Sequence, residues 1–514
     1  MTDNRAHRTR ATFPGGRLCA LLASVVLCSA VVLAGCSDDR SAATTTTTTT
    51  ERSTTTAPPA TTAPAAEQAP QPAWVVQLGS PKDDSLEAVA GRRDAVVATG
   101  WAEGAVTAPA GAKANGGARG GRDALVVVVG SDGKVRTTDQ AGAERNESAA
   151  GVGSASDTTI TCGSTDGAPS GAPGGSDDAW CAPVDPQGVL GPVHQQGGTD
   201  ADHLRSVAVA SDGGVGYAAG DTLGLFPGAT DTTAGVLGGG DVLLWQVAPD
   251  GAPRWVRQFG TAGADVGRGV STTADGDALV VGSTQGDIGG PSRGDLDGFI
   301  ARFDPTGLPR WIRQFGTDRA DSARAVATGG EASRGNETFV AVGTTDGALA
   351  PAVGGKVTAA DAPKLDGTKP APSNAGGTDA LAVAFDSSGN QKWAAQLGTP
   401  GTDEAAGVAI DGRNVLVAGT TTAAIDTAGR PAAGGRDGFL AAVDAASGAV
   451  RWITQFGSAG DEDVTGISIT EDGVAVVSGR TTAKMGDTPN AGGTDGFLIA
   501  FPLPSAGGRV SSSL

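Results

Sequence analysis

The sequence predicts an all-β fold, a seven-bladed β-propeller of four-stranded antiparallel blades that is closed by the N-terminal strand. The first observation is an internal repeat of the form W-x-x-Q-[FL]-G-[ST]. It begins at Trp74, Trp255, Trp311, Trp393 and Trp452. The second observation is that an apolar segment led by aspartate occurs seven times. These segments begin at Asp123, Asp178, Asp241, Asp297, Asp379, Asp437 and Asp495.

The third observation concerns the two ends of the repeat array. It starts with a lone Trp-type segment at Trp74, and its last unit stops after the Asp-led segment that ends at Phe501. The N-terminal strand can therefore supply the strand that the last sheet lacks. Such closure leaves no long unprotected sheet edge, which an open stack of sheets would have at both ends.

One repeat shows how four strands arise. After residues 311–317 we expect a strand over 323–327, a second over 339–343 and a third over 380–385, before a turn at 386–389 leads to the next tryptophan. Turn residues flank every apolar run, as in antiparallel meanders. The repeats at Val135 and Val193 lack the tryptophan but keep the spacing.

The N-terminus predicts an export signal. Four arginines precede an apolar run over 18–33, too short for a confident membrane span. The run ends in Leu33-Ala34-Gly35-Cys36, which resembles the lipobox of bacterial lipoproteins. That resemblance implies a signal peptide over 1–35, lipidation of Cys36 and a location on the extracytoplasmic face of the cell membrane, held there by the lipid anchor.

The composition sets the remaining domain boundaries. Residues 36–73 comprise the lipidated cysteine and a Thr/Pro-rich linker that we expect to be disordered, because it has almost nothing apolar to bury. The propeller is predicted over 74–503, and a disordered tail over 504–514.

The net charge excludes one class of partner. It is −19 for the whole chain, and removal of residues 1–35, with four arginines and one aspartate, would bring it near −22. Nucleic acids require a surplus of Lys and Arg, so we expect no nucleic-acid binding. We expect the protein to be a monomer.

The repeat as a whole resembles that of the bacterial seven-bladed β-propeller (SBBP-type) family. The resemblance rests on W-x-x-Q-[FL]-G-[ST], an acidic loop, G-[ST]-T, G-G-x-D-[AG]-[FL] and a D-x-x-G turn, and it extends over about 74–501. It implies the propeller fold and an extracytoplasmic setting. It implies no activity.

Two sets of residues receive structural interpretations. Cys162 and Cys181 lie on adjacent predicted strands of one blade, outside the cytoplasm, and we expect them to form a disulfide that staples this blade. The repeated tryptophans are interpreted as core filling between blades. A sugar-stacking platform is the alternative, but binding surfaces rarely repeat around a whole ring.

An acid precedes the first strand of every repeat. The set is Asp84, Glu147, Asp202, Asp265, Asp321, Asp403 and Glu462. Metal binding or acid–base chemistry is one reading of such a ring. A role repeated in every blade is better explained by the fold, through hydrogen bonds from turn N–H groups. The exception to examine is Asp461-Glu462-Asp463, where like charges require a nearby cation.

Function follows from what the sequence contains. It has no G-x-S-x-G, H-E-x-x-H or P-loop motif and only three histidines. We therefore expect a binding or scaffolding module and not an enzyme, without a cofactor, although Ca²⁺ stays open. The ligand is expected to be a protein, peptide or envelope glycan on the face with the longer loops, which include 222–239 and 344–377. The alternative is a propeller enzyme, a quinoprotein or lactonase-like hydrolase with a metal-dependent site in the central channel.

Overall fold

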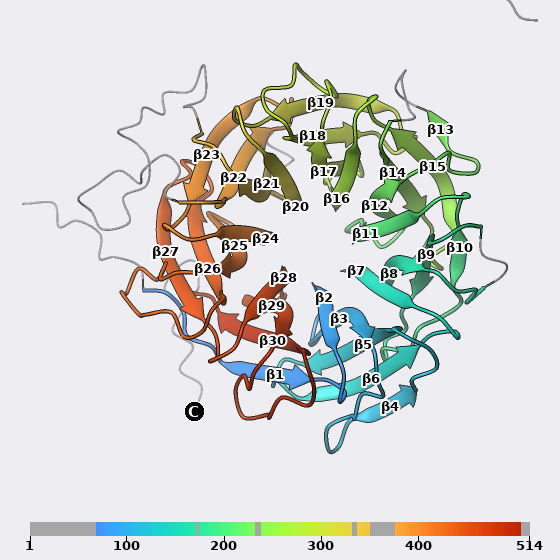
Figure 1. Ribbon diagram of the computed structural model, residues 1–514, viewed down its shortest axis with the longest axis vertical. Helices are drawn as coiled ribbons and strands as arrows, with labels where there is room; N and C mark the ends of the chain where they lie inside the picture. Colours follow the sequence, from blue (N-terminus) through green and yellow to red (C-terminus); the bar gives the residue numbers. More distant parts are fainter. Residues whose placement is uncertain (1–67, 171–173, 232–237, 331–336, 350–375, 505–514) are drawn as a thin grey trace, which may run out of the picture. The chain divides into compact units, whose positions relative to one another are not determined.

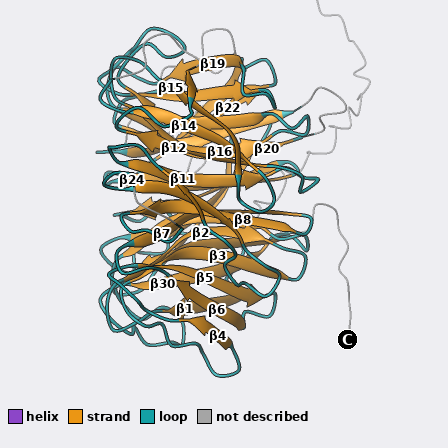
Figure 2. Ribbon diagram, turned by 90° about the vertical axis from the view of Figure 1, so that its right-hand side faces the viewer, coloured by secondary structure: helices purple, strands orange, loops and turns teal. Residues whose placement is uncertain are grey.

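Seven antiparallel sheets are arranged radially about one axis in the computed structural model (Figure 1). The structure describes residues 68–170, 174–231, 238–330, 337–349 and 376–504, all within one compact unit, Ala65–Leu514. Every regular element in these ranges is a strand, and none of them contains a helix that could cross a membrane (Figure 2). The predicted all-β seven-bladed propeller is confirmed.

In the first six blades the four main strands follow one another outward from the axis in chain order. The first three blades contain β2 (Asp84–Gly91), β3 (Ala95–Ala102), β5 (Asp123–Gly130) and β6 (Val135–Ala141); β7 (Glu147–Ala155), β8 (Thr158–Thr165), β9 (Asp178–Pro183) and β10 (His194–Gln196); and β11 (Asp202–Val209), β12 (Gly216–Thr222), β14 (Asp241–Val247) and β15 (Pro253–Phe259). The next three contain β16 (Asp265–Thr272), β17 (Ala278–Thr284), β18 (Asp297–Phe303) and β19 (Pro309–Phe315); β20 (Asp321–Gly329), β21 (Thr338–Thr345), β22 (Asp379–Asp386) and β23 (Gln391–Leu397); and β24 (Asp403–Asp411), β25 (Asn414–Thr421), β26 (Asp437–Asp444) and β27 (Val450–Phe456).

The seventh blade joins the two ends of the chain. It contains β28 (Glu462–Ile469), β29 (Val474–Thr481) and β30 (Asp495–Pro502), and its outer strand is β1 (Trp74–Leu78). The pairing of β1 with β30 is antiparallel and runs from Trp74 opposite Ala500 to Leu78 opposite Gly496. The predicted closure by the N-terminal strand is therefore confirmed.

Two short outer strands were not predicted. β4 (Lys113–Gly116) pairs in parallel with β6, and β13 (Thr230–Asp231) pairs in parallel with β15. Both belong to the connection between the second and third strands of their blade, which folds back along the outer edge. Four polar or small residues give no strand pattern, so this pairing depends on the neighbouring strand and not on local sequence preference.

The repeated tryptophans join neighbouring blades. Trp393 and Trp452 are buried, as predicted, but Trp74, Trp255 and Trp311 are only partly buried at the edge of the core. All five lie near the start of the outer strand, where neighbouring blades meet. The indole N–H of Trp311 donates to the carbonyl of Ser387 in a turn of the next blade, and Trp74, Trp255 and Trp393 make equivalent bonds.

The disulfide lies inside the second blade. Cys162 on β8 and Cys181 on β9 are direct partners in the sheet, with Cα atoms 4.1 Å apart, and both are fully buried. The predicted disulfide is confirmed. It reinforces the blade whose outer strand, β10, has only 3 residues.

Candidate functional site at the axis of the ring

The repeated Q-[FL]-G-[ST] segment serves two carboxylates in every blade. The glutamine side chain donates to the aspartate that begins the third strand, over 2.7–3.1 Å in all seven blades. The backbone N–H of the residue four before the first strand donates to the acid that begins that strand, over 2.5–2.8 Å. The repeat therefore encodes a hydrogen-bonded joint between consecutive blades.

The glycine of this segment leaves room for the two carboxylates. A Cβ atom at any of the seven glycines would lie 2.0–2.5 Å from an oxygen of the third-strand aspartate. The set is Gly79, Gly142, Gly197, Gly260, Gly316, Gly398 and Gly457. No side chain fits at that distance, which explains why the motif contains glycine at a position without a left-handed backbone conformation.

These contacts support the structural interpretation of the acid ring. All seven acids are at most 3% exposed, and each accepts a backbone hydrogen bond at the start of its strand. Across the described ranges, no group of three or more His, Cys, Asp or Glu side chains could hold a metal ion. Ca²⁺ binding stays a prediction that these facts do not test.

Burial raises the pKa of several of these acids, and the neighbouring third-strand aspartate raises it further. The pKa of Asp84 rises to about 6, mainly because the carboxylate is desolvated, with a smaller contribution from Asp495. The pKa values of Glu147, Asp202, Asp265 and Asp321 are raised for the same reasons. Each of these groups therefore holds its proton more tightly in the folded state than in the unfolded chain.

Mild acidification is expected to stabilise the domain. A raised carboxyl pKa lowers stability when the group is charged, so the free energy of unfolding should rise as pH falls from 7.5 through about 6. Turn aspartates with lowered pKa values, such as Asp304 and Asp386, have the opposite effect, because their protonation lowers the free energy of unfolding below about pH 4. Thermal unfolding between pH 4.5 and 8 measures the effect. Asp84→Asn should flatten the profile and Asp83→Asn, at an exposed site, should not; a melting temperature that falls steadily from pH 7.5 to 5 would contradict this account.

The seven innermost strands share a β-bulge. In each of them the register with the second strand shifts around one residue, the fourth of the strand. The bulged residues are Glu87, Ala150, Arg205, Arg268, Arg324, Ala406 and Thr465. A bulged residue lies outside the ladder, so its side chain is released from the regular alternation of the sheet. Each bulge therefore lies at the same position, the fourth residue, of one of the seven innermost strands, which surround the axis in Figure 1.

Small residues follow these bulges because the inner strands approach closely. A Cβ at Gly269 would lie 2.8 Å from the carbonyl oxygen of Arg324 on the next blade. A Cβ at Gly151 would lie equally close, 2.8 Å, to the Cα of Ser206. The backbones of neighbouring blades are thus nearly in contact beside the bulges, which fixes the relative positions of the bulged residues.

Three consecutive blades contribute an arginine at the bulge. Arg205 pairs with Asp221 over 2.5 Å, and Arg324 pairs with Glu404 over 3.2 Å. Arg268 lies between them, and within the described part of the chain its side chain forms no hydrogen bond or ion pair. Its Nε atom is buried. Burial lowers the pKa of Arg268, and the positive charges of Arg205 and Arg324 lower it further, against a smaller opposing effect of the Asp221 carboxylate.

The next two blades, the sixth and seventh, carry paired charges. Asp463 contacts Arg436 over 2.8 Å and Arg480 over 3.0 Å, and Arg436 also lies 3.8 Å from Glu404. Arg436 is therefore the cation that the 461–463 cluster required. Glu462 itself makes the same strand-start contacts as the acids of the other blades.

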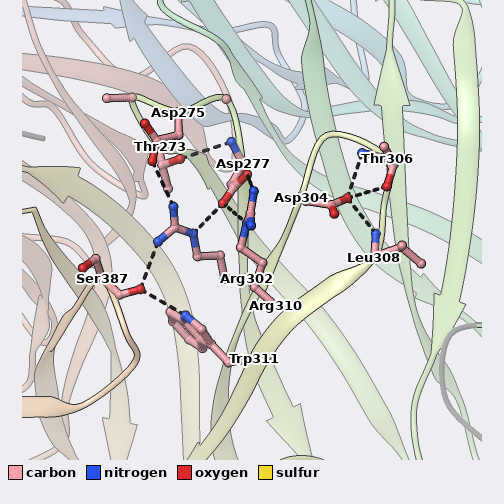
Figure 3. Close-up of polar contacts among 12 residues, drawn as sticks. Thr273, Asp275, Asp277, Arg302, Asp304, Thr306, Leu308, Arg310, Trp311 and Ser387 are labelled. Atoms are coloured by element: carbon pink, nitrogen blue, oxygen red, sulfur yellow. Dashed lines mark hydrogen bonds and ion pairs between the residues drawn. The ribbon is translucent and has the colours of Figure 1, made fainter. Parts of the chain in front are cut away.

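A second charged cluster has a structural role. Figure 3 shows Arg302 and Arg310 converging on Asp277, with an Nε–Oδ2 distance of 2.6 Å for each pair. Arg302 also donates to the carbonyl of Ser387, which accepts from Trp311 as well. These contacts join the fourth blade to the turn between β22 and β23 of the fifth, and they leave Asp277 no exposed surface.

Several predicted features lie outside the described residues. These are the signal peptide, Cys36, the linker up to residue 67 and the tail from 505, together with 232–237 and 350–375 of the longer loops. The rest of the 222–239 loop is described. There, Phe226 is buried with its ring 5.5 Å from that of Trp245, whereas Leu223 and Leu225 are 56% and 68% exposed.

Sequence reasoning missed the arginines at the axis. The signal was available, because Arg205, Arg268 and Arg324 stand at the same place in three successive repeats, three residues after the acid. Their position at a bulge and their partners could not be deduced from the sequence. Only the register shows that this place is a bulge, and only the contacts show which arginine has no partner.

Comparisons with known proteins bear on the fold and not on the function. No protein-family model matches the chain, and no curated protein matches it in sequence. Among solved structures it is similar to Kuenenia stuttgartiensis hydrazine synthase, at 11% identity over 78% of this chain and 94% of the other, with a TM-score of 0.41. It is also similar to the Pseudomonas aeruginosa periplasmic gluconolactonase, at 16% identity over 80% and 97%, with a TM-score of 0.40. At these values the likenesses carry no argument about activity, and the resemblance to the SBBP-type family stays a prediction.

Proposed function

We propose that this protein is a lipid-anchored binding module on the extracytoplasmic face of the cell membrane, with a protein, peptide or envelope glycan as its ligand. The observation that supports binding is that its polar side chains fall into two groups. The side chains that repeat in every blade are occupied by hydrogen bonds of the fold, whereas those that differ lie at the axis and on the longer loops. Variable residues on a rigid scaffold are where recognition usually occurs.

The loop face supports this proposal further. Leu223 and Leu225, on the connection between the second and third strands of their blade, are exposed, although the hydrophobic effect favours burial of leucine. The acids that begin the inner strands lie at the same face, because each strand starts there. A ligand on this face would contact apolar side chains on the loops and polar side chains at the axis.

Site-specific photo-crosslinking in intact cells tests this proposal. A photoreactive residue at Leu225, 68% exposed on the loop face, should yield cross-linked partners, because this face receives the ligand. The matched control is Leu308, 58% exposed in a short turn on the opposite face, which should yield none. Cross-links of equal yield at both positions would remove the support for a binding face, and stoichiometric Ca²⁺ in the purified protein would favour the alternative, a propeller enzyme.

The anchor has its own test. Cys36→Ala should release the protein from the membrane or leave it as an uncleaved precursor, because acylation at Cys36 is the proposed tether. Fractionation of cells and medium followed by immunoblotting measures the outcome. Retention of the cleaved variant in the membrane fraction would refute a lipid anchor at this residue while leaving the binding proposal intact.

A further inference from the structure

We propose that Arg268 binds a single carboxylate group of the ligand at the axis of the ring. This inference rests on the proposed binding function and specifies the chemistry of the ligand. Its basis is geometric: Arg268 occupies the bulge of the innermost strand β16, and its guanidinium has no hydrogen-bond or ion-pair partner in the described part of the chain.

The cost of leaving Arg268 unpaired argues for an external anion. Its Nε–H is buried without an acceptor, and a buried donor or charge without a partner is strongly unfavourable. The other inward arginines of the bulges have carboxylates within 2.5 Å and 3.2 Å. Arg268 thus lacks the carboxylate partner that Arg205 and Arg324 each have. A positive charge that the fold holds in place without an internal partner is preorganised to bind an external anion.

The charges around Arg268 indicate the charge of the anion that it would bind. Asp221 is occupied by Arg205, with His203 at 3.5 Å, and Glu404 is shared between Arg324 and Arg436. Asp221 and Glu404 thus already serve other cations, and Arg268 adds one positive charge that has no carboxylate partner of its own. A monoanion would balance that charge, whereas a doubly charged phosphate would also meet the repulsion of Asp221 and Glu404.

The guanidinium also selects the shape of the anion. Its planar fork of N–H groups matches the two oxygens of a carboxylate, which it binds through two parallel hydrogen bonds. Arg268 is only partly buried, and the side chains of Arg205 and Arg324 on the flanking blades are 39% and 37% exposed. A carboxylate on a flexible ligand could therefore reach Arg268 from the axis.

Thermal unfolding with small anions tests the inference. We expect 100 mM acetate to raise the melting temperature of the full-length protein above its value in 100 mM chloride at equal ionic strength by about 2 °C, since a ligand that binds only the folded state stabilises it. Arg268→Met should abolish this difference, and in chloride it should melt at or above the wild-type temperature because an unpaired charge has been removed. Arg319→Met, which makes the same charge change on an exposed loop, should respond to acetate as wild type does.

The contrary outcomes are distinct. A response to acetate that persists in Arg268→Met would overturn the site, and a larger response to phosphate than to acetate would overturn the choice of a carboxylate. If Arg268→Met does not fold, Arg268→Lys is the substitute, because it keeps the charge and removes the planar guanidinium. Its melting temperature should respond less to acetate than that of the wild type. An undiminished response to acetate would count against bidentate binding. If the wild-type protein shows no response to acetate while the Leu225 cross-links form, this inference alone is refuted. An Arg268-dependent response without cross-links would refute only the proposed partner.

Discussion

A chain that lacks Trp74–Leu78 is expected to lose the folded state of the whole propeller, and not merely to fray at one end. The deletion removes the outer strand of the seventh blade and with it two buried apolar side chains, Val76 and Leu78. Each costs roughly 1.5–3 kcal/mol to remove from the core. The deletion also leaves Asp495 without the hydrogen bond from Gln77 and exposes the edge of β30. This loss is comparable with the total stability of a domain, about 5–15 kcal/mol.

Complementation provides the control for this deletion. A synthetic peptide of residues 68–82, added in excess, should restore cooperative unfolding by circular dichroism, because it supplies the missing strand in the same register. A scrambled peptide should not. A truncated protein that melts within about 2 °C of the full chain would show that the ring does not depend on its closing strand.

Asp277→Ala is the point substitution with the largest expected effect. It removes the carboxylate that pairs with Arg302, whose side chain is only 8% exposed, and leaves that guanidinium buried without its principal partner. Removing one member of a buried ion pair typically costs about 3–5 kcal/mol. Chemical denaturation of the purified domain should therefore show a large decrease in the free energy of unfolding, together with weaker contact between the fourth and fifth blades.

The same cluster contains a matched control. Asp275 also approaches Arg302, at 3.5 Å, but its side chain is 71% exposed, so solvent screens the interaction and Asp275→Ala should have little effect. Asp277→Asn, which keeps the shape and removes the charge, should fall between the two. Equal stabilities of the two alanine variants would mean that Arg302 finds another acceptor.

The number of blades, their closure and the disulfide could be predicted from sequence because each depends on repetition or on adjacency in a sheet. The apolar runs between Trp311 and Trp393 already implied three strands between them, even though the interval contains a long insertion. The part-exposed tryptophans were not predictable, because their burial depends on a turn in the next blade. The arginines of the inner strands were missed for a related reason. A bulge is a property of two paired strands, and the arginine at its centre looks like any surface cation in a single strand.

Closure by β1 also has a consequence for the time course of folding. Gln77 and Asp495, which share a hydrogen bond in the finished ring, are 418 residues apart in the chain. At a typical synthesis rate of about 5–20 residues per second, the N-terminal strand would wait on the order of half a minute before its partner exists. Throughout that interval an apolar strand remains available to wrong partners, including a second nascent chain. A chaperone or export factor that shields this segment until β30 emerges would increase the yield of native protein, and the need for it would vanish in a permuted chain that begins at β2 and ends with β1.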